Sequence, residues 1–136
     1  MRIYVDGGSL GNPGPITVAV ICEELNKKYV KRLGEGTNND AEYLAIIEGL
    51  KKAKEWGLKE FELASDSQLV LKQIAGKYAI TVERFREYVQ MIRDLLMNFR
   101  KVKFIWVRRD LNPAHQLVAD NLPDVEVVME YEGEKV

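Results

Sequence analysis

Four acidic residues stand at positions where a carboxylate disfavours folding. Asp6 and Asp66 each end a short apolar run, and Glu42 and Asp120 lie in helical stretches whose neighbours are Ala, Leu, Ile and Val. An unpaired buried carboxylate costs several kcal/mol, so a group of them requires a counter-charge. When all the ligand atoms are oxygens, a hard divalent cation such as Mg²⁺ or Mn²⁺ supplies that charge.

Size and composition indicate one globular domain. The 136 residues are 46% hydrophobic and 30% charged, which is ordinary for such a domain. No apolar run approaches the ~20 residues that span a bilayer. A charge at Asp6 precedes any signal-peptide core, and the lone Cys22 lies in an apolar run. We therefore expect a cytoplasmic protein without membrane association, in which Cys22 is a small core residue.

Charge is unevenly distributed along the chain. Residues 124–136 hold five acids and one base, whereas residues 1–123 hold 16 acids and 19 bases. We therefore divide the chain into a main domain, 1–123, and an acidic C-terminal tail, 124–136, which is either an edge strand or a frayed end. The formal net charge of −1 argues against a protein that coats nucleic acid by charge alone.

The pattern of polar and apolar residues predicts five strands and four helices. The strands are 2–6, 17–22, 28–33, 61–64 and 103–107. The helices are 39–56, 68–74, a long one capped by Thr81 that reaches Phe99, and a last one opened by Asn112 and Pro113 that ends near Leu122. The first three strands indicate an antiparallel meander. The alternation of strand and helix that follows implies a parallel part of the sheet.

The four acids are expected to converge on one spot. Asp6 and Asp66 follow strand ends, where α/β sheets bind ligands. Glu42 and Asp120 lie within two turns of helix starts, and Asp120 is three residues from the apolar Leu117. Such a set suits two hard cations ~3.5–4 Å apart, which clamp the attacking and leaving oxygens of phosphoryl transfer. The inferred chemistry is phosphodiester hydrolysis. For any single acid, a helix cap or a surface charge is the simpler interpretation.

The motifs around these acids, taken together, resemble a known family. They are, in order, Asp6-Gly7-Gly8-Ser9-Leu10-Gly11-Asn12-Pro13-Gly14-Pro15, Thr37-Asn38-Asn39-Asp40-Ala41-Glu42, Ser65-Asp66-Ser67-Gln68-Leu69-Val70, and Asn112 through Ala119-Asp120. In order and spacing they resemble type 1 ribonuclease H, in the short form without a basic helical protrusion. The resemblance extends over nearly the whole chain, to about Leu122.

This resemblance implies a ribonuclease H-like α/β fold. Its five-stranded mixed sheet, flanked by helices, has strands 1–3 antiparallel and strands 1, 4 and 5 parallel. The implied activity is that of an endoribonuclease that hydrolyses the RNA strand of RNA/DNA hybrids with two Mg²⁺ or Mn²⁺ ions and leaves 5′-phosphomonoester products. Asp6, Glu42, Asp66 and Asp120 fall on the family's catalytic, metal-binding acids. The partner is the hybrid, and no obligate protein partner is evident.

Substrate contacts are implied for a set of small and amide side chains. Telling RNA from DNA requires contact with the 2′-hydroxyl, which the wide minor groove exposes. The resemblance assigns sugar and base contacts to the glycines and amides, and a DNA phosphate contact to the threonine. The set is Gly7, Gly11, Asn12, Thr37, Asn38, Asn39 and Gln68. For Asn38 and Asn39, turn and helix-cap chemistry is the alternative.

Other polar and aromatic residues receive structural interpretations. The only histidine, His115, lies five residues before the last of the four acids, and a lone helical histidine is more often a surface or packing residue. Trp56 and Trp106 are expected to be core or packing aromatics rather than platforms on which bases stack. The Arg108-Arg109 pair is either a phosphate contact or an exposed charged turn.

Three other functions stay open. One is a related nuclease of broader specificity that includes double-stranded RNA. Another is an inactive nucleic-acid-binding module, and a third is an interaction domain whose acidic tail recruits a partner. Because the basic protrusion is absent, hybrid binding is expected to be weak and sensitive to salt.

Overall fold

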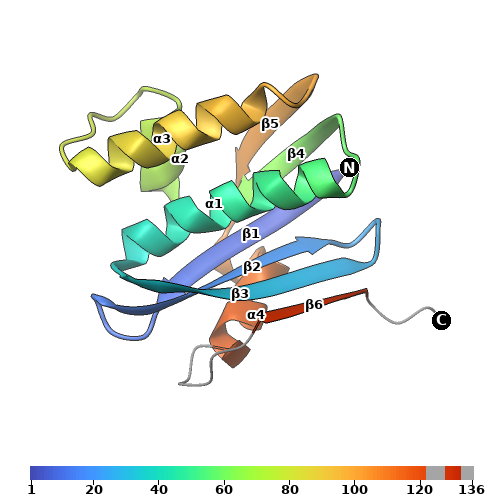
Figure 1. Cartoon of the computed structure of the whole chain (residues 1–136), viewed down its shortest axis with the longest axis horizontal. Helices are drawn as coiled ribbons and strands as arrows, with labels where there is room; N and C mark the ends of the chain where they lie inside the picture. The colour runs from blue at the N-terminus through green and yellow to red at the C-terminus, as the bar shows by residue number, and fades with distance from the viewer. Residues whose placement is uncertain (122–127, 133–136) are drawn as a thin grey trace.

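One mixed sheet carries helices on both of its faces (Figure 1). The computed structural model describes residues 1–121 and 128–132. The strands are β1 (Arg2–Ser9), β2 (Gly14–Cys22), β3 (Lys27–Gly36), β4 (Glu60–Ser65), β5 (Lys101–Trp106) and β6 (Val128–Glu132). The helices are α1 (Asn38–Glu55), α2 (Gln68–Ile74), α3 (Glu83–Leu96) and α4 (Pro113–Asn121), with a 3₁₀ turn at Arg109–Leu111. Within these two ranges, no helix is both long and apolar enough to cross a membrane.

The strand order is β5-β4-β1-β2-β3-β6. Strands β1, β2 and β3 pair antiparallel, and β4 pairs parallel with both β1 and β5. The expected five-stranded mixed sheet is therefore confirmed. In addition, β6 pairs antiparallel with β3, within the segment predicted as an acidic tail. Residues 122–127, which include the predicted domain boundary, lie outside the described residues.

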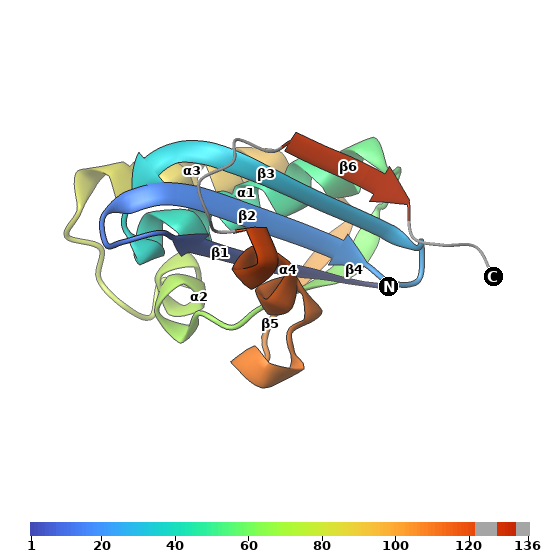
Figure 2. The same cartoon turned by 90° about the horizontal axis from the view of Figure 1, so that it is seen from below.

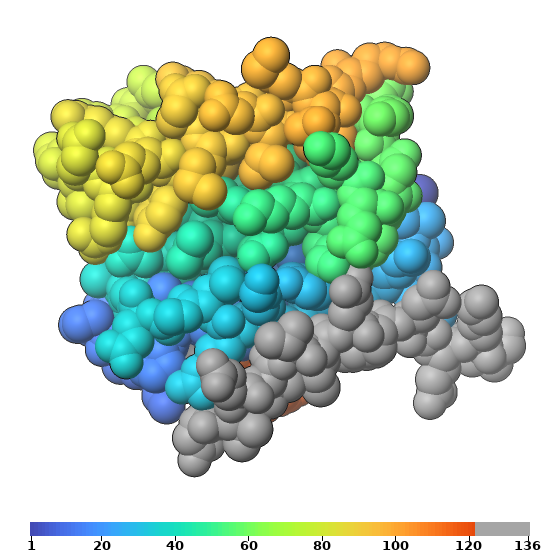
Figure 3. Space-filling model, viewed as in Figure 1, coloured from blue at the N-terminus to red at the C-terminus, as the bar shows by residue number. Residues whose placement is uncertain are grey.

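Two hydrophobic clusters fill the two faces of the sheet. The larger cluster lies under α1 and α3 and includes Val5 and Ile46; Figure 3 shows α3 packed directly against α1 along this side. The smaller cluster includes Ala19 and Val118 and lies where α4 crosses β1 and β2 (Figure 2). Alternate strand residues face opposite sides. Val5 therefore faces α1, and Asp6, whose cross-strand partner is Ala19, lies on the α4 side.

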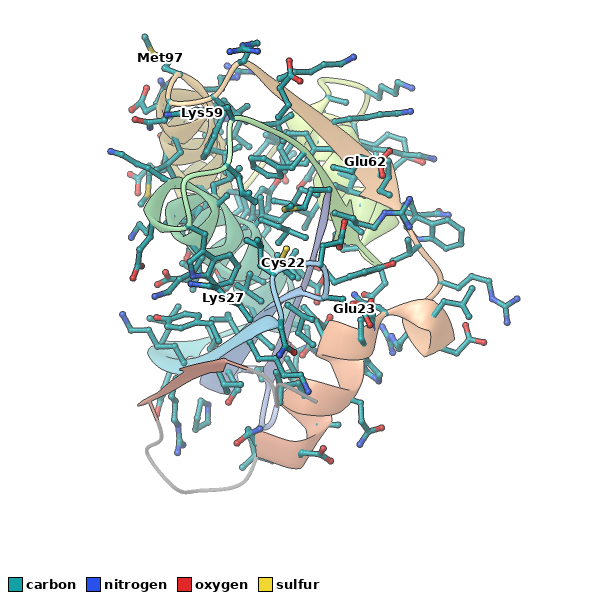
Figure 4. All side chains as sticks on the ribbon, turned by 90° about the vertical axis from the view of Figure 1, so that its right-hand side faces the viewer. Cys22, Glu23, Lys27, Lys59, Glu62 and Met97 are labelled. Carbon is teal, nitrogen blue, oxygen red and sulfur yellow. The ribbon has the colours of Figure 1, made fainter. Side chains whose placement is uncertain are left out.

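Cys22 lies inside the larger cluster. Its side chain is fully buried; in Figure 4 it lies near the middle of the view, whereas Met97 projects from the edge of the molecule. The expectation that Cys22 is a small core residue is confirmed.

Several element boundaries differ from the sequence pattern. Strand β1 continues to Ser9 and β2 begins at Gly14, so the loop between them contains only residues 10–13. Glycines have low strand propensity, which is why the pattern alone ends the first strand too early. Helix α3 begins at Glu83 with Val82 as its N-cap, so the predicted cap at Thr81 is wrong.

A buried carboxylate, Asp40, fixes the first turn of α1. It accepts hydrogen bonds from the backbone N–H of Thr37 at 2.9 Å and from the Thr37 hydroxyl at 2.8 Å. Arg84 on α3 donates two hydrogen bonds to it, at 2.7 and 3.0 Å, and the Tyr88 hydroxyl donates one at 3.1 Å. Burial acts to raise the pKa of Asp40, but the hydrogen bonds from Arg84 and Thr37 outweigh it and lower the pKa to about 2. Asp40 therefore binds α3 to the start of α1.

Replacement of this carboxylate tests the connection between α1 and α3. The folded pKa of Asp40 lies below its ordinary 3.8, so the carboxylate contributes about 2 kcal/mol of stability above pH 4, which is lost as the pH falls toward 2. We predict that Asp40→Asn lowers the free energy of unfolding at pH 7 by about this amount. The difference from wild type should shrink below pH 4 in urea titrations. Asp110→Asn, at an exposed carboxylate paired with Arg108, should change little. An equal loss in both variants would contradict the assignment.

Candidate active site

Three of the four predicted acids meet where β1 and β4 separate. The parallel pairing of these strands ends at Tyr4 and Ala64, and Asp6 and Asp66 each follow two residues later. Beyond this point the structure has a hollow of about 300 Å³. The residues that line it are Asp6, Gly7, Gly8, Ser9, Asn38, Asn39, Glu42, Asp66, Ser67, Arg109, His115, Val118 and Ala119. Side chains from β1, α1, α4 and the end of β4 thus share one space.

Glu42 reaches this hollow because β1 has a glycine where α1 crosses it. A Cβ atom on Gly7 would lie 2.1 Å from the carbonyl oxygen of Ala41, so no other residue permits the approach. The Gly7 N–H donates to Glu42 Oε1 at 3.3 Å. The other oxygen, Oε2, is shielded from solvent and has no hydrogen-bond partner among the described residues. Glu42 therefore directs an unsatisfied oxygen into the site.

Burial and the charge of a neighbouring carboxylate raise the pKa of two of these acids. Burial, followed by the charge of Asp66, raises the pKa of Asp6 to about 6, although contacts with Glu42 and His115 act in the opposite direction. Burial, followed by the charge of Asp6, raises the pKa of Glu42 well above its usual value. The protein itself therefore does little to neutralise the negative charge of Asp6 and Glu42. A cation placed among them would lower both pKa values.

His115 occupies the place in this hollow that was expected for Asp120. Its Nδ1 lies 3.1 Å from Asp6 Oδ2, and ligand atoms of Asp6, Asp66 and His115 all lie within 4.8 Å of one another. The expectation that His115 is only a surface or packing residue does not fit this position. Asn112 was predicted only as a helix cap. Its Nδ2 donates to Asp66 Oδ2 at 3.3 Å and to the Val5 carbonyl at 2.9 Å, which connects the start of α4 to the site.

Asp120 does not join the group, and the expected convergence of all four acids is wrong in this respect. It is exposed, accepts a hydrogen bond from Gln116 Nε2 at 2.7 Å, and lines a separate hollow between α4 and strands β2 and β3. Residues five apart on a helix differ by about 140° in direction. His115 and Ala119 therefore face the active site, and Asp120 cannot.

Helical phase explains why Asp120 lies outside the group. Asp120 shares a side of α4 with Leu117, which lines the second hollow. The side chains that α4 buries are Ala114 and Val118. These two residues are four apart and mark the side of α4 that faces the sheet. A helical phase based on them predicts that His115, next to Ala114, lies nearer the hollow than Asp120.

The residues of the hollow fit a divalent cation. They supply one imidazole nitrogen and several carboxylate oxygens, one of which is buried without a partner in residues 1–121 and 128–132. Both carboxyls with raised pKa values would gain from a positive charge. Mg²⁺ and Mn²⁺ are the ions that carboxylate-rich sites suit.

Some of the predicted substrate-binding residues connect the segments around the hollow, and others line it directly. Asn38 Oδ1 accepts hydrogen bonds from the N–H of Ser9 at 3.2 Å and from its hydroxyl at 3.0 Å, and the Asn38 N–H donates to Asn12 Oδ1 at 3.1 Å. These bonds connect the β1–β2 hairpin to α1. Asn39 and Gly7 line the hollow itself.

The other three predicted substrate-binding residues lie nearby. Gly11 takes φ +89° in the hairpin loop, a conformation that favours glycine. Gln68 is exposed at the first position of α2. Both hydrogen-bond donors of Thr37 are directed at Asp40, so in this arrangement Thr37 has no donor left for a phosphate.

Trp106 lies outside the core. Its side chain is 47% exposed at the end of β5, and its indole N–H donates to the Asp66 carbonyl at 3.1 Å. Trp56, by contrast, is partly buried and packs against the larger cluster. In the 3₁₀ turn region, Arg108 pairs with Asp110, and Arg109 lines the hollow.

Comparison with known proteins gives consistent matches. The family model described as "Reverse transcriptase-like" matches residues 16–121. A ribonuclease H from Pseudomonas entomophila is 33% identical over 90% of this chain and 89% of its own length. The crystal structure of ribonuclease H1 from Halobacterium salinarum superposes with a TM-score of 0.80 and 32% identity, over 89% of this chain and 95% of that one. The LC11 ribonuclease H1 in complex with an RNA/DNA hybrid has a TM-score of 0.78 and 31% identity, over 88% and 94% of the two chains.

The fold and the acidic hollow define a nuclease-like α/β domain. The matches with known proteins identify the family to which it belongs. The chain belongs to the ribonuclease H family, as the sequence motifs predict. It spans 35% of the length of three mycobacterial relatives to which it is 33% identical.

Relief of charge repulsion offers a test of the cluster that does not require catalysis. The charge of Asp66 helps to raise the pKa of both Asp6 and Glu42. We predict that Asp66→Asn raises the melting temperature in chelator by a few degrees, a gain of about 1 kcal/mol. Asp120→Asn, which removes an exposed charge outside the hollow, should leave it unchanged. A lower melting temperature for Asp66→Asn would show that these carboxylates do not repel one another.

Proposed function

We propose that the protein is an endoribonuclease that hydrolyses the RNA strand of RNA/DNA hybrids with the help of divalent metal ions. One observation carries the proposal. Asp6, Glu42 and Asp66 converge in a hollow where two of the three carboxyls have raised pKa values and one buried oxygen finds no partner in the described part of the chain. Membership of the ribonuclease H family supports it, as does the hybrid-bound structure of a relative.

The three carboxylates would hold the metal, Mg²⁺ or Mn²⁺, with two ions in the substrate complex. When bound, such ions supply an activated water and stabilise the charge on the leaving 3′ oxygen. The product of this hydrolysis carries a 5′-phosphomonoester. The protein's own part is to keep the acids in place. The Gly7 N–H holds Glu42, the Asn112 amide holds Asp66, and the β1–β2 pairing fixes Asp6. Asp120 is not included in the proposed metal set, because it faces the other hollow.

The polar rim supports recognition of the hybrid's minor groove. The hydrogen bonds of Asn38 with Ser9 and Asn12 pre-organise two segments that present amides beside the acids. Amides and nearby backbone suit contacts with 2′-hydroxyls and base edges. We assign direct substrate contacts to Asn12, Asn38 and Asn39, and close backbone approach to the glycines. Gln68, at the start of α2, would extend this surface. Thr37 would act through Asp40, which it helps to hold.

Cleavage of labelled duplexes tests the proposal. We expect the hybrid to be cut in Mg²⁺ or Mn²⁺, not in chelator, and faster than double-stranded RNA or double-stranded DNA. Asp66→Asn should abolish turnover while the circular dichroism spectrum is retained. Equal cleavage of double-stranded RNA would indicate a nuclease of broader specificity. Binding without cleavage of any duplex would indicate an inactive nucleic-acid-binding module.

The amide network gives a separate prediction for substrate binding. We expect Asn38→Ala to raise KM for the hybrid several-fold with a smaller change in kcat, because it loosens the hairpin and removes a contact but leaves the acids in place. Steady-state kinetics against hybrid concentration would measure both constants. Asn98→Ala, at the end of α3 where Asn98 Nδ2 donates to the Leu95 carbonyl, is the matched control. A change confined to kcat would place Asn38 in the chemistry rather than in binding.

A further inference from the structure

The histidine in the site gives it a mixed set of ligands. Asp6 comes from β1, Asp66 follows β4, and His115 comes from α4, and one ligand atom of each lies within 4.8 Å of the others. The chain contains a single histidine. Its presence in this hollow is therefore not explained by a high histidine content. Its side chain is 40% exposed, with Nδ1 at 3.1 Å from Asp6 Oδ2.

The start of α4 positions the helical turn that carries this imidazole. Asn112 caps the helix, accepting the Ala114 N–H at 3.0 Å through Oδ1, while its Nδ2 donates to Asp66 Oδ2 at 3.3 Å. Ala114 and Val118 are buried against the sheet. Asn112 thus fixes both the carboxylate of Asp66 and the helical turn that carries His115. This is the arrangement that a ligand set requires, because neighbouring groups orient each ligand.

We propose that His115 is a direct ligand of the divalent ion held by Asp6 and Asp66, and that its imidazole makes the site select first-row transition-metal ions, Mn²⁺ among them, over Mg²⁺. The inference rests on the proposed function only in taking the hollow as the metal site. Mg²⁺ prefers an all-oxygen environment, whereas an imidazole nitrogen is a better ligand for transition metals. A simple ion pair between His115 and Asp6 is the alternative, and it would not discriminate between metals.

Metal-binding isotherms in the absence of nucleic acid test the proposal. Mn²⁺ and Mg²⁺ would be titrated separately into the metal-free wild type and into three variants: His115→Ala, His115→Asp and Asp120→Asn. We expect the wild type to bind Mn²⁺ more tightly than Mg²⁺. His115→Ala should raise the Mn²⁺ dissociation constant at least about tenfold, with a smaller effect on Mg²⁺. His115→Asp should shift the preference toward Mg²⁺ because it makes all the ligand atoms oxygens. Asp120→Asn should match the wild type.

A spectroscopic measurement gives an independent result. Co²⁺ bound in the hollow should show visible absorption bands that change in His115→Ala and stay the same in Asp120→Asn. An unchanged Mn²⁺ to Mg²⁺ preference in His115→Ala, or identical Co²⁺ spectra, would overturn the role of His115 as a ligand. Hybrid cleavage with an unchanged preference would overturn this inference and leave the proposed function intact. If the wild type bound neither Mn²⁺ nor Mg²⁺, the inference about His115 would also be overturned.

Discussion

The repulsion among Asp6, Glu42 and Asp66 is the constraint on which the rest of the site depends. Three carboxyls share a hollow where burial and mutual charge raise the pKa of two of them. The fold maintains this arrangement through contacts that are themselves restrictive. Gly7 allows α1 to lie directly on β1, and Asn112 connects α4 to Asp66. Without these contacts, the side chains would relieve the repulsion by moving apart.

The first two turns of α1 show how differently the protein treats two buried acids. Asp40 is surrounded by the guanidinium of Arg84 and the donors of Thr37 and Tyr88, and its pKa is lowered to about 2. Glu42, two residues later, accepts the N–H of Gly7, lies beside Asp6, and has a pKa raised well above its usual value. A counter-charge is thus built in where a carboxylate serves the structure. Where a carboxylate serves the site, its counter-charge is left to come from outside the chain.

The sequence located the acids that belong to strands more securely than the acid on the last helix. Asp6 and Asp66 follow apolar runs, and their place near the strand ends depends only on those runs. The predicted position of Asp120 depends instead on the phase of a nine-residue helix that has apolar residues on more than one side. An error of one position in that phase turns a side chain by about 100°. The same uncertainty in helical phase favours a surface interpretation of His115. For Trp106, the sequence shows a large aromatic residue at a strand end but does not reveal whether anything covers it.

The sequence by itself determined the family, the mixed sheet and three of the acids, because hydrophobic periodicity and turn residues are local and the motifs stand in a fixed order. Only the tertiary structure decided which side chain of α4 meets Asp6. That choice depends on how Ala114 and Val118 pack on the sheet and how Asn112 joins Asp66. These are contacts between residues far apart in the chain, and their geometry is set by packing rather than by spacing along the sequence.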